Sequence, residues 1–306
     1  MPRFYPRDYN PTLLMKHVSA PAWALFAGAA YWGVIWWPYR LLGQAGLDGL
    51  WATLFTYVVA CIVGFAALRG AWRAFTKLSF FSVLMGASIG WSNLAYVLGV
   101  LHGEVMRVLL LFYLAPLWTV PLAHFLLGER LDRTGLSVMA LATIGAMTML
   151  WHPELGMPLP QGLAEWLGLA AGFLFALGNV LVRKLHDLTD GEKSLVIWAG
   201  VALAGLVHVG QSALPASRAW EIAVSQAPLV LAIGVTLVAA GLALQYGLSR
   251  LPANRAVVIL LSELVVAAIA SWLIAGESLR VRDWIGGALI VAATLVSAYS
   301  TRPGTS

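Results

Sequence analysis

The chain is a series of long apolar runs separated by short connections that carry most of its charged residues. A helix of about 20 apolar residues is long enough to cross the hydrocarbon core of a bilayer. We therefore predict an all-α membrane protein with ten transmembrane helices. They fall at residues 22–42, 50–68, 78–100, 105–127, 135–151, 164–185, 194–212, 228–248, 253–275 and 283–300.

A shift of 148 positions aligns part of the first half of the chain with part of the second, without a gap. Identical residues that keep this register are Leu94 with Leu242, Ala95 with Ala243, Gly99 with Gly247, Arg107 with Arg255, Gly128 with Gly276, Glu129 with Glu277 and Leu131 with Leu279. A shift of 143 relates the front of each half and places Trp23 on Trp166, Gly28 on Ala171, Trp32 on Phe175 and Arg40 on Arg183. The pattern predicts a duplicated unit of five helices.

Lys and Arg are distributed unevenly between alternate connections. Fourteen lie in the set that contains the N-terminus and five in the other, which accounts for all 19. The positive-inside rule then places both termini in the cytoplasm. Because five is an odd number of crossings, the two repeats are inverted, as in many secondary transporters. We predict a cytoplasmic segment at 1–20, repeats at 21–151 and 164–300, a periplasmic connection at 152–163 and a cytoplasmic tail at 301–306.

The composition, with 60% hydrophobic and 11% charged residues, is typical of a membrane protein. The net charge of +5 does not indicate nucleic-acid binding, because the basic residues lie at the ends of apolar runs. The single cysteine, Cys61, permits no disulfide within the chain. The histidines lack the spacing of a metal site, so we expect no metal and no cofactor. The expected partners are the bilayer and a small-molecule substrate, without an obligate protein partner.

Three sequence features occur together with this duplication. The first span contains Tyr31-Trp32-Gly33, and a small-residue-rich span in each half ends in Gly-Glu, at Gly128-Glu129 and Gly276-Glu277. With ten spans in two repeats, these features resemble the drug/metabolite transporter superfamily, above all its EamA-like bacterial permeases. The ninth span of that family often contains Leu-Glu-Pro. Here Ser262-Glu263-Leu264 keeps the Glu without the Pro, and Ala115-Pro116 in the first half keeps the Pro without the Glu.

The resemblance implies a secondary carrier in the bacterial inner membrane, with a central cavity between the two repeats. Members of the family are frequently exporters of amino acids or related metabolites. The Gly-Glu motifs say little about the substrate.

Glu263 is a carboxylate near the middle of the predicted span 253–275, roughly 15 Å from either end. An ionised carboxylate at that depth costs several kcal/mol unless it faces water or a partner. Three roles are consistent with it: coupling to a proton or substrate in a cavity, a buried hydrogen bond that packs helices, or a gate. Its neighbours one turn away are apolar or small, so its partner must come from another span or from the substrate.

Asn93, Asn179 and Gln245 are uncharged polar residues inside predicted spans. The two asparagines follow small residues at helical spacing, which favours a role in close helix packing. The alternative is hydrogen bonding to a substrate, because an amide binds a zwitterion without a fixed charge.

Trp32, Tyr96 and Tyr113 lie deeper than the interfacial positions usual for Trp and Tyr. A cavity lined by such rings suits an apolar or aromatic moiety. Every lysine is peripheral to the predicted spans, which disfavours a strongly anionic substrate.

Arg107 and Arg255 both fall in the first turn of a predicted helix, where the helix dipole disfavours a cation. They are candidates for pairing across the mouth of a cavity or for attracting anionic groups, and Glu104 is the expected local partner of Arg107. For the Gly-Glu motifs we expect a structural role, with Gly ending the helix and Glu bonding to a neighbouring loop.

We therefore expect a secondary active transporter of small amphipathic metabolites, above all an amino-acid exporter that works by alternating access. The alternatives are a carrier of drugs or other metabolites, a membrane enzyme acting on a lipid-linked substrate, and a scaffold without transport activity. An enzyme would require clustered Asp, Glu, His or Cys at a membrane surface, and the short connections are sparse in these residues, so we expect no catalytic residues.

Overall fold

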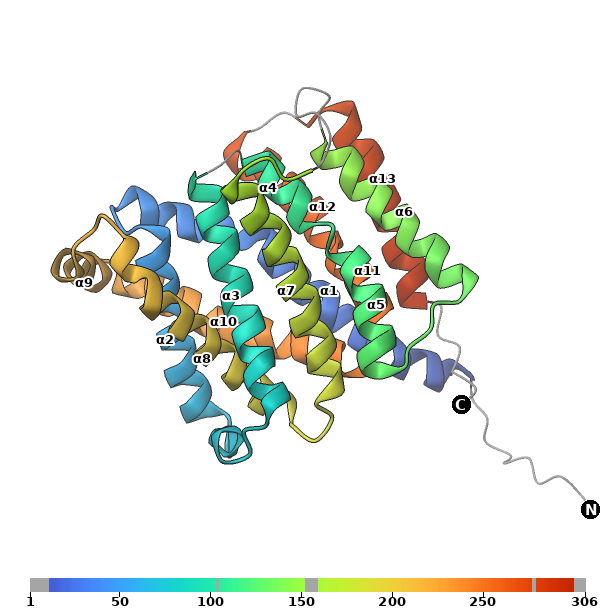
Figure 1. Ribbon diagram of the computed structural model, residues 1–306, viewed down its shortest axis with the longest axis horizontal. Coiled ribbons are helices and arrows are strands. Elements are labelled where there is room, and N and C mark those ends of the chain that lie inside the picture. Colours follow the sequence, from blue (N-terminus) through green and yellow to red (C-terminus); the bar gives the residue numbers. More distant parts are fainter. Residues whose placement is uncertain (1–10, 103–104, 152–158, 277–278, 300–306) are drawn as a thin grey trace, which may run out of the picture.

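The computed structural model describes residues 11–102, 105–151, 159–276 and 279–299, and all regular elements in these ranges are helices (Figure 1). They are α1 (Pro11–Gln44), α2 (Gly49–Ala67), η1 (Ala71–Thr76), α3 (Phe80–His102), α4 (Val105–Phe112), α5 (Ala115–Leu127), α6 (Arg133–Leu150), α7 (Leu163–Lys184), α8 (Asp190–His208), η3 (Val209–Gln211), α9 (Ala216–Ser225), α10 (Ala227–Arg250), α11 (Ala253–Leu260), α12 (Ser262–Ala275) and α13 (Val281–Tyr299).

Helices overlap all ten of the apolar runs identified in the sequence. Eight candidate spans within the described residues are long and apolar enough to cross a membrane. The chain is therefore an all-α, multi-pass membrane protein. α1 and α13 are not among these eight, so a crossing by either of them stays a prediction. The helix α1 begins at Pro11, inside the segment predicted to precede the first span, and residues 152–158 of the predicted connection lie outside the described residues.

Two of the predicted spans are each divided into two helices, which corrects the expectation of continuous spans. The span 105–127 is interrupted at Tyr113 and Leu114, between α4 and α5, and the span 253–275 at Leu261, between α11 and α12. Tyr113 and Leu261 are 148 positions apart, so the interruption recurs in the register of the sequence repeat.

The two interruptions have different local causes. Pro116 has no N–H and so removes one hydrogen bond from the helix of the first half. In the second half, the Ser262 hydroxyl donates to the Ile259 carbonyl at 2.6 Å and competes with the backbone for that acceptor. Leu264 N then donates to Leu261 O, three residues back, at 3.1 Å. The same break is thus produced by a proline in one half and a serine in the other.

The packing of the helices repeats when the two halves are exchanged. α7 packs against α3, α4 and α5, while its counterpart α1 packs against α10, α11 and α12. α3 packs against α8 as α10 packs against α2. Two pairs join counterparts directly, α2 with α8 and α6 with α13, and Figure 1 shows the latter pair side by side at one end of the molecule.

Two glycines make equivalent close contacts in the two halves. A Cβ on Gly99 of α3 would lie 2.9 Å from Ala164 O of α7, and one on Gly247 of α10 would lie 2.8 Å from Pro21 O of α1. The glycines are 148 positions apart and their contacts 143, the two shifts found in the sequence. Small residues at these positions allow the backbones to approach closely.

The outer surface carries many exposed apolar side chains, among them Phe125 at 81% exposure and Leu163 at 76%. Such a surface is suited to lipid rather than to water. The short helices η1 and α9 add the exposed Trp72 and Trp220, which are also 148 positions apart.

Candidate functional site

Glu263 lies in the first turn of α12, directly after the break at Leu261. The expectation of a carboxylate in the middle of an unbroken helix was therefore wrong. The N-terminal end of a helix carries a partial positive charge, which favours a carboxylate there. The break thus gives the half-buried Glu263 a more favourable position than a continuous helix would.

Tyr113 provides a partner for this carboxylate from the other half of the chain. Its side chain lies close enough to interact with the Glu263 carboxylate, and Tyr96 of α3 also lies close to the same group. Tyr113 is itself a residue of the break between α4 and α5, and it is buried. The two broken helices therefore bring together a carboxylate and a phenol.

Aromatic rings surround Tyr113 on one side. The Phe112 ring lies 5.1 Å from Tyr113, 5.4 Å from Tyr96 and 5.4 Å from Phe175, measured between centroids. These rings come from α3, α4, the α4–α5 break and α7. They form an apolar, polarisable cluster around Tyr113.

Trp32 is not in ring contact with this group within the described residues. It packs instead with Tyr31 at 6.0 Å in a separate hydrophobic cluster. Its neighbour Gly33 does reach the site, because a Cβ there would lie 2.8 Å from Glu263 O. The α1 backbone therefore packs directly on the start of α12.

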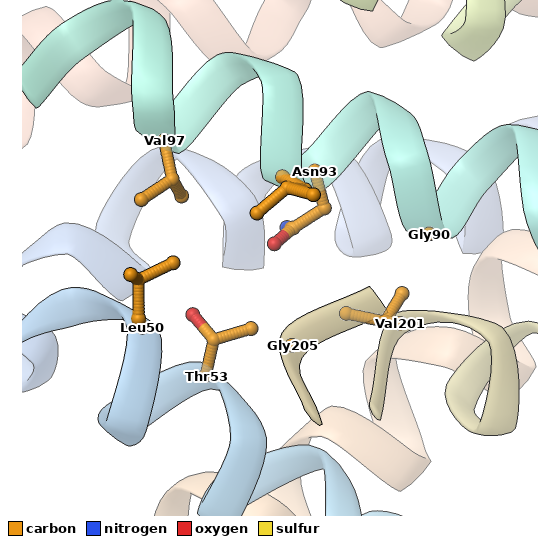
Figure 2. Close-up of a pocket in the computed structure, with 8 residues that line it drawn as sticks. Leu50, Thr53, Gly90, Asn93, Val97, Val201 and Gly205 are labelled. Atoms are coloured by element: carbon orange, nitrogen blue, oxygen red, sulfur yellow. The ribbon is translucent and has the colours of Figure 1, made fainter. Parts of the chain in front are cut away.

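Asn93 lies away from Glu263, in a small pocket between α2, α3 and α8. Figure 2 shows the polar ends of Asn93 and Thr53 facing this pocket, which Leu50, Val97 and Val201 also line. Its volume of about 10 Å³ is enough for about one water molecule and too small for an amino acid. A substrate contact by Asn93 stays a prediction.

Asn179 and Gln245 each have a buried polar atom without a hydrogen-bond partner in the described structure, Nδ2 and Oε1 respectively. Asn179 lies one turn before Arg183 on α7, and Gln245 one turn before Ser249 on α10. Arg183 Nη1 donates to Ser249 O at 3.4 Å, so α7 and α10 meet near their ends. Unsatisfied buried amides are costly, so each of the two amides has capacity to bind a further polar group.

Arg107 pairs with Glu165 of α7, with 2.8 Å between Nε and Oε1, and its Nη2 donates to Leu159 O at 3.1 Å. Glu104, the expected local partner, lies outside the described residues. Arg255 is half-buried, and its guanidinium has no hydrogen-bond or ion-pair partner among the described residues.

The structural role expected of the first Gly-Glu motif is confirmed. Gly128 ends α5 in the left-handed conformation at φ 71°, and Gly276 ends α12 in the same way at φ 70°. Glu129 accepts hydrogen bonds from Arg183 Nε at 2.7 Å and from Ala253 N at 2.9 Å. It thus links α5, α7 and the start of α11, while Glu277 lies outside the described residues.

The start of α8 contains two buried charged residues that the sequence analysis placed outside the span. Lys193 is 2% exposed and donates to Ser249 Oγ at 2.8 Å, and Glu192 lies 3.6 Å from Lys77 Nζ. Thr189 and Glu192 form a capping box, a sequence signal that marks the true start of the helix.

Comparison with known proteins places these residues in a transporter. Residues 162–299 match the model of the EamA-like transporter family. An uncharacterized transporter of Archaeoglobus fulgidus is 26% identical over 226 residues, which cover 74% of this chain and 76% of that protein. A protein of Salmonella typhimurium named as a probable amino-acid metabolite efflux pump is 26% identical over 200 residues, covering 60% and 64% of the two chains.

The family match and these two relatives support a place for the chain in the drug/metabolite transporter superfamily. The part of the chain that matches the family model contains Glu263, Asn179, Gln245 and Arg255. A solved structure described as a crystal structure of protein has the same fold, with a TM-score of 0.70 and 20% identity, and the match covers 90% of this transporter and 96% of that chain.

Proposed function

We propose that this transporter is a secondary active carrier that exports small amphipathic metabolites, above all amino acids, across the bacterial inner membrane. Two inverted five-helix repeats, with both termini in the cytoplasm, would alternate access to a site between them. The exchange of helix contacts between the halves supports this, since α1 is surrounded by α10, α11 and α12 as α7 is by α3, α4 and α5.

The observation that carries the proposal is the meeting of Glu263 and Tyr113 at the two helix breaks. A carboxylate beside a phenol can take a proton or the ammonium group of a substrate. Because each partner belongs to a different repeat, movement of the repeats changes the environment of the carboxylate. Substrate or proton binding is thereby linked to the change in access.

The substrate class is supported by the walls of the site. Tyr96 lies near the carboxylate, its ring packs with that of Phe112, and Phe112 packs in turn with Phe175. These rings suit the apolar side chain of an amino acid. The name of the Salmonella relative, a probable amino-acid metabolite efflux pump, agrees with this class.

Flux assays in proteoliposomes test the proposal. The purified protein would be reconstituted and supplied with a panel of radiolabelled amino acids and, separately, lipophilic drugs. We expect saturable transport of at least one apolar amino acid. Folded protein that moves none of them contradicts the substrate class, and transport of drugs alone would assign the protein to a different substrate.

Glu263→Gln tests the role of the carboxylate. We expect this variant to lose accumulation driven by a pH gradient while counterflow stays measurable, because the site remains but cannot change its protonation. Glu221→Gln on α9, whose side chain is 62% exposed, is the control and should behave as the wild type. An unchanged pH dependence in Glu263→Gln would remove Glu263 from proton coupling.

A further inference from the structure

Arg255 differs from all other buried or half-buried basic residues of the described chain. Six basic side chains are at least half-buried: Arg107, Arg183, Lys184, Lys193, Arg255 and Arg282. Five of them have an ion pair or a hydrogen bond. Of these six, in the part of the chain that the structure describes, only Arg255 has a side chain with neither.

The sequence repeat shows what Arg255 lacks. Its counterpart Arg107, 148 positions earlier, is neutralised by Glu165 of α7. The shift of 143 that relates α7 to α1 places Ala22 at the position of Glu165, and Ala22 is 4% exposed. The second half therefore keeps the arginine, while the position of the acid that would pair with it, on α1 of the first half, carries only a methyl group.

The surroundings of Arg255 favour the binding of an anion to its guanidinium group. It lies in the first turn of α11, where the helix dipole is unfavourable to a cation. Glu129, a carboxylate at this end of α11, already accepts hydrogen bonds from Arg183 Nε and from Ala253 N. Ser297 donates to the backbone carbonyl of Arg255 and leaves its side chain unoccupied.

We propose that Arg255 binds the carboxylate of the substrate at the mouth where α10 ends and α11 begins. This inference rests on the proposed function and adds the requirement that the substrate carries a free carboxylate. Arg255 precedes Glu263 by eight residues, or about 12 Å along the helix axis. One amino acid cannot span this distance with its own two charges, so the carboxylate binds Arg255 first and the ammonium group reaches Glu263 in a later step.

Transport kinetics measured separately from each side of the membrane test the proposal. Arg255→Gln should raise KM for a free amino acid, supplied on the side predicted to be cytoplasmic, on the order of tenfold, because a charge-assisted hydrogen bond is lost. KM on the opposite side, kcat, and KM for the corresponding amino-acid amide should change little. Arg255→Lys should restore part of the preference for the free acid, since it keeps the charge without the planar fork.

Arg107→Gln is the matched control from the other repeat. Because Arg107 is paired with Glu165, we expect this variant to have a lower thermal stability and the same ratio of KM for amide and acid as the wild type. Each assay would be repeated in vesicles with and without anionic lipid. A defect in Arg255→Gln that occurs only with anionic lipid would identify lipid phosphate as the anion and overturn the proposal.

Two other results would also overturn it. Equal loss of flux for acid and amide, or equal loss from both sides, would make Arg255 a structural residue. Should Arg255→Gln fail to fold, the ratio of KM for amide and acid in Arg255→Lys decides, and a ratio unchanged from the wild type contradicts the inference. Absence of amino-acid flux in the wild type would instead refute the proposed function itself, and this inference with it.

Discussion

Two glycines allow neighbouring helices to pack closely against the helix breaks. A Cβ on Gly33 of α1 would lie 2.8 Å from Glu263 O, and one on Gly172 of α7 would lie 2.5 Å from Phe112 O. Both distances are shorter than ordinary van der Waals contact, so any larger side chain must push the helices apart. The position of the carboxylate thus depends on residues that carry no chemistry of their own.

Gly33→Ala is expected to destabilise the protein by about 1–3 kcal/mol and to reduce pH-driven flux, because overpacking displaces the start of α12. Thermal unfolding in detergent and the flux assay measure the two effects. Gly43→Ala in the same helix is the control, since a Cβ there would meet nothing within 4 Å. Equal stability of the two variants would show that the α1–α12 contact is loose.

The partners of single residues were the hardest feature to predict from sequence. Glu263 could be identified, because a lone carboxylate in an apolar run is unusual. Its contact with Tyr113 could not be predicted, since it joins positions 150 apart and depends on how the two breaks meet. Arg107 likewise has Glu165 as its partner, 58 residues away, where the sequence offered only the local Glu104.

At the scale of elements, Glu129 connects three helices through one carboxylate. It follows the end of α5, pairs with Arg183 near the end of α7 and caps the first N–H of α11 at Ala253. A carboxylate at a helix N-terminus both satisfies a free donor and interacts favourably with the dipole. The first repeat is thereby fastened to the second at this end of the molecule.

Glu129→Ala should lower the free energy of unfolding by about 1–2 kcal/mol, because the cap and the ion pair are both lost. Glu129→Gln should lose less stability than Glu129→Ala, since the amide oxygen can still accept a hydrogen bond from Ala253 N. Thermal unfolding compares the two variants with Glu221→Ala, whose exposed pair with Arg218 is expected to contribute at most about 1 kcal/mol. A Glu129→Ala protein as stable as the wild type would contradict this role.

Helix positions followed closely from the apolar runs, whereas the breaks within them did not. Pro116 could have indicated the first break, since proline removes a helical hydrogen bond. The second break has no proline, and its cause is a serine hydroxyl that bonds to Ile259 O. Serine at such a position often leaves a helix intact, so the pattern of the sequence alone could not reveal it.

At the scale of the whole molecule, the proposed inversion of the repeats makes equivalent turns face opposite sides of the membrane. In a Cys61→Ala background, cysteines would be introduced singly at Arg133 and Arg280, which are both exposed and lie just beyond α5 and α12. We expect a membrane-impermeant maleimide to label the cysteine at 280 in intact cells. The cysteine at 133 should be labelled only after permeabilisation, and labelling of both from one side would exclude the inversion.

The pairing of α6 with α13 has a consequence for the origin of the chain. A Cβ on Gly145 of α6 would lie 2.7 Å from Gly286 O of α13, so counterparts from the two halves meet backbone to backbone. Under the proposed inversion, a single five-helix ancestor could bury this surface only against a second copy of itself that is inserted in the opposite orientation in the same membrane. Such a protein would have to insert in both orientations in equal amounts. It would therefore need few charged residues that favour one orientation. Fusion of two copies into one gene would remove that requirement, and each half could then lose residues that the other retained, as Ala22 and Glu165 illustrate.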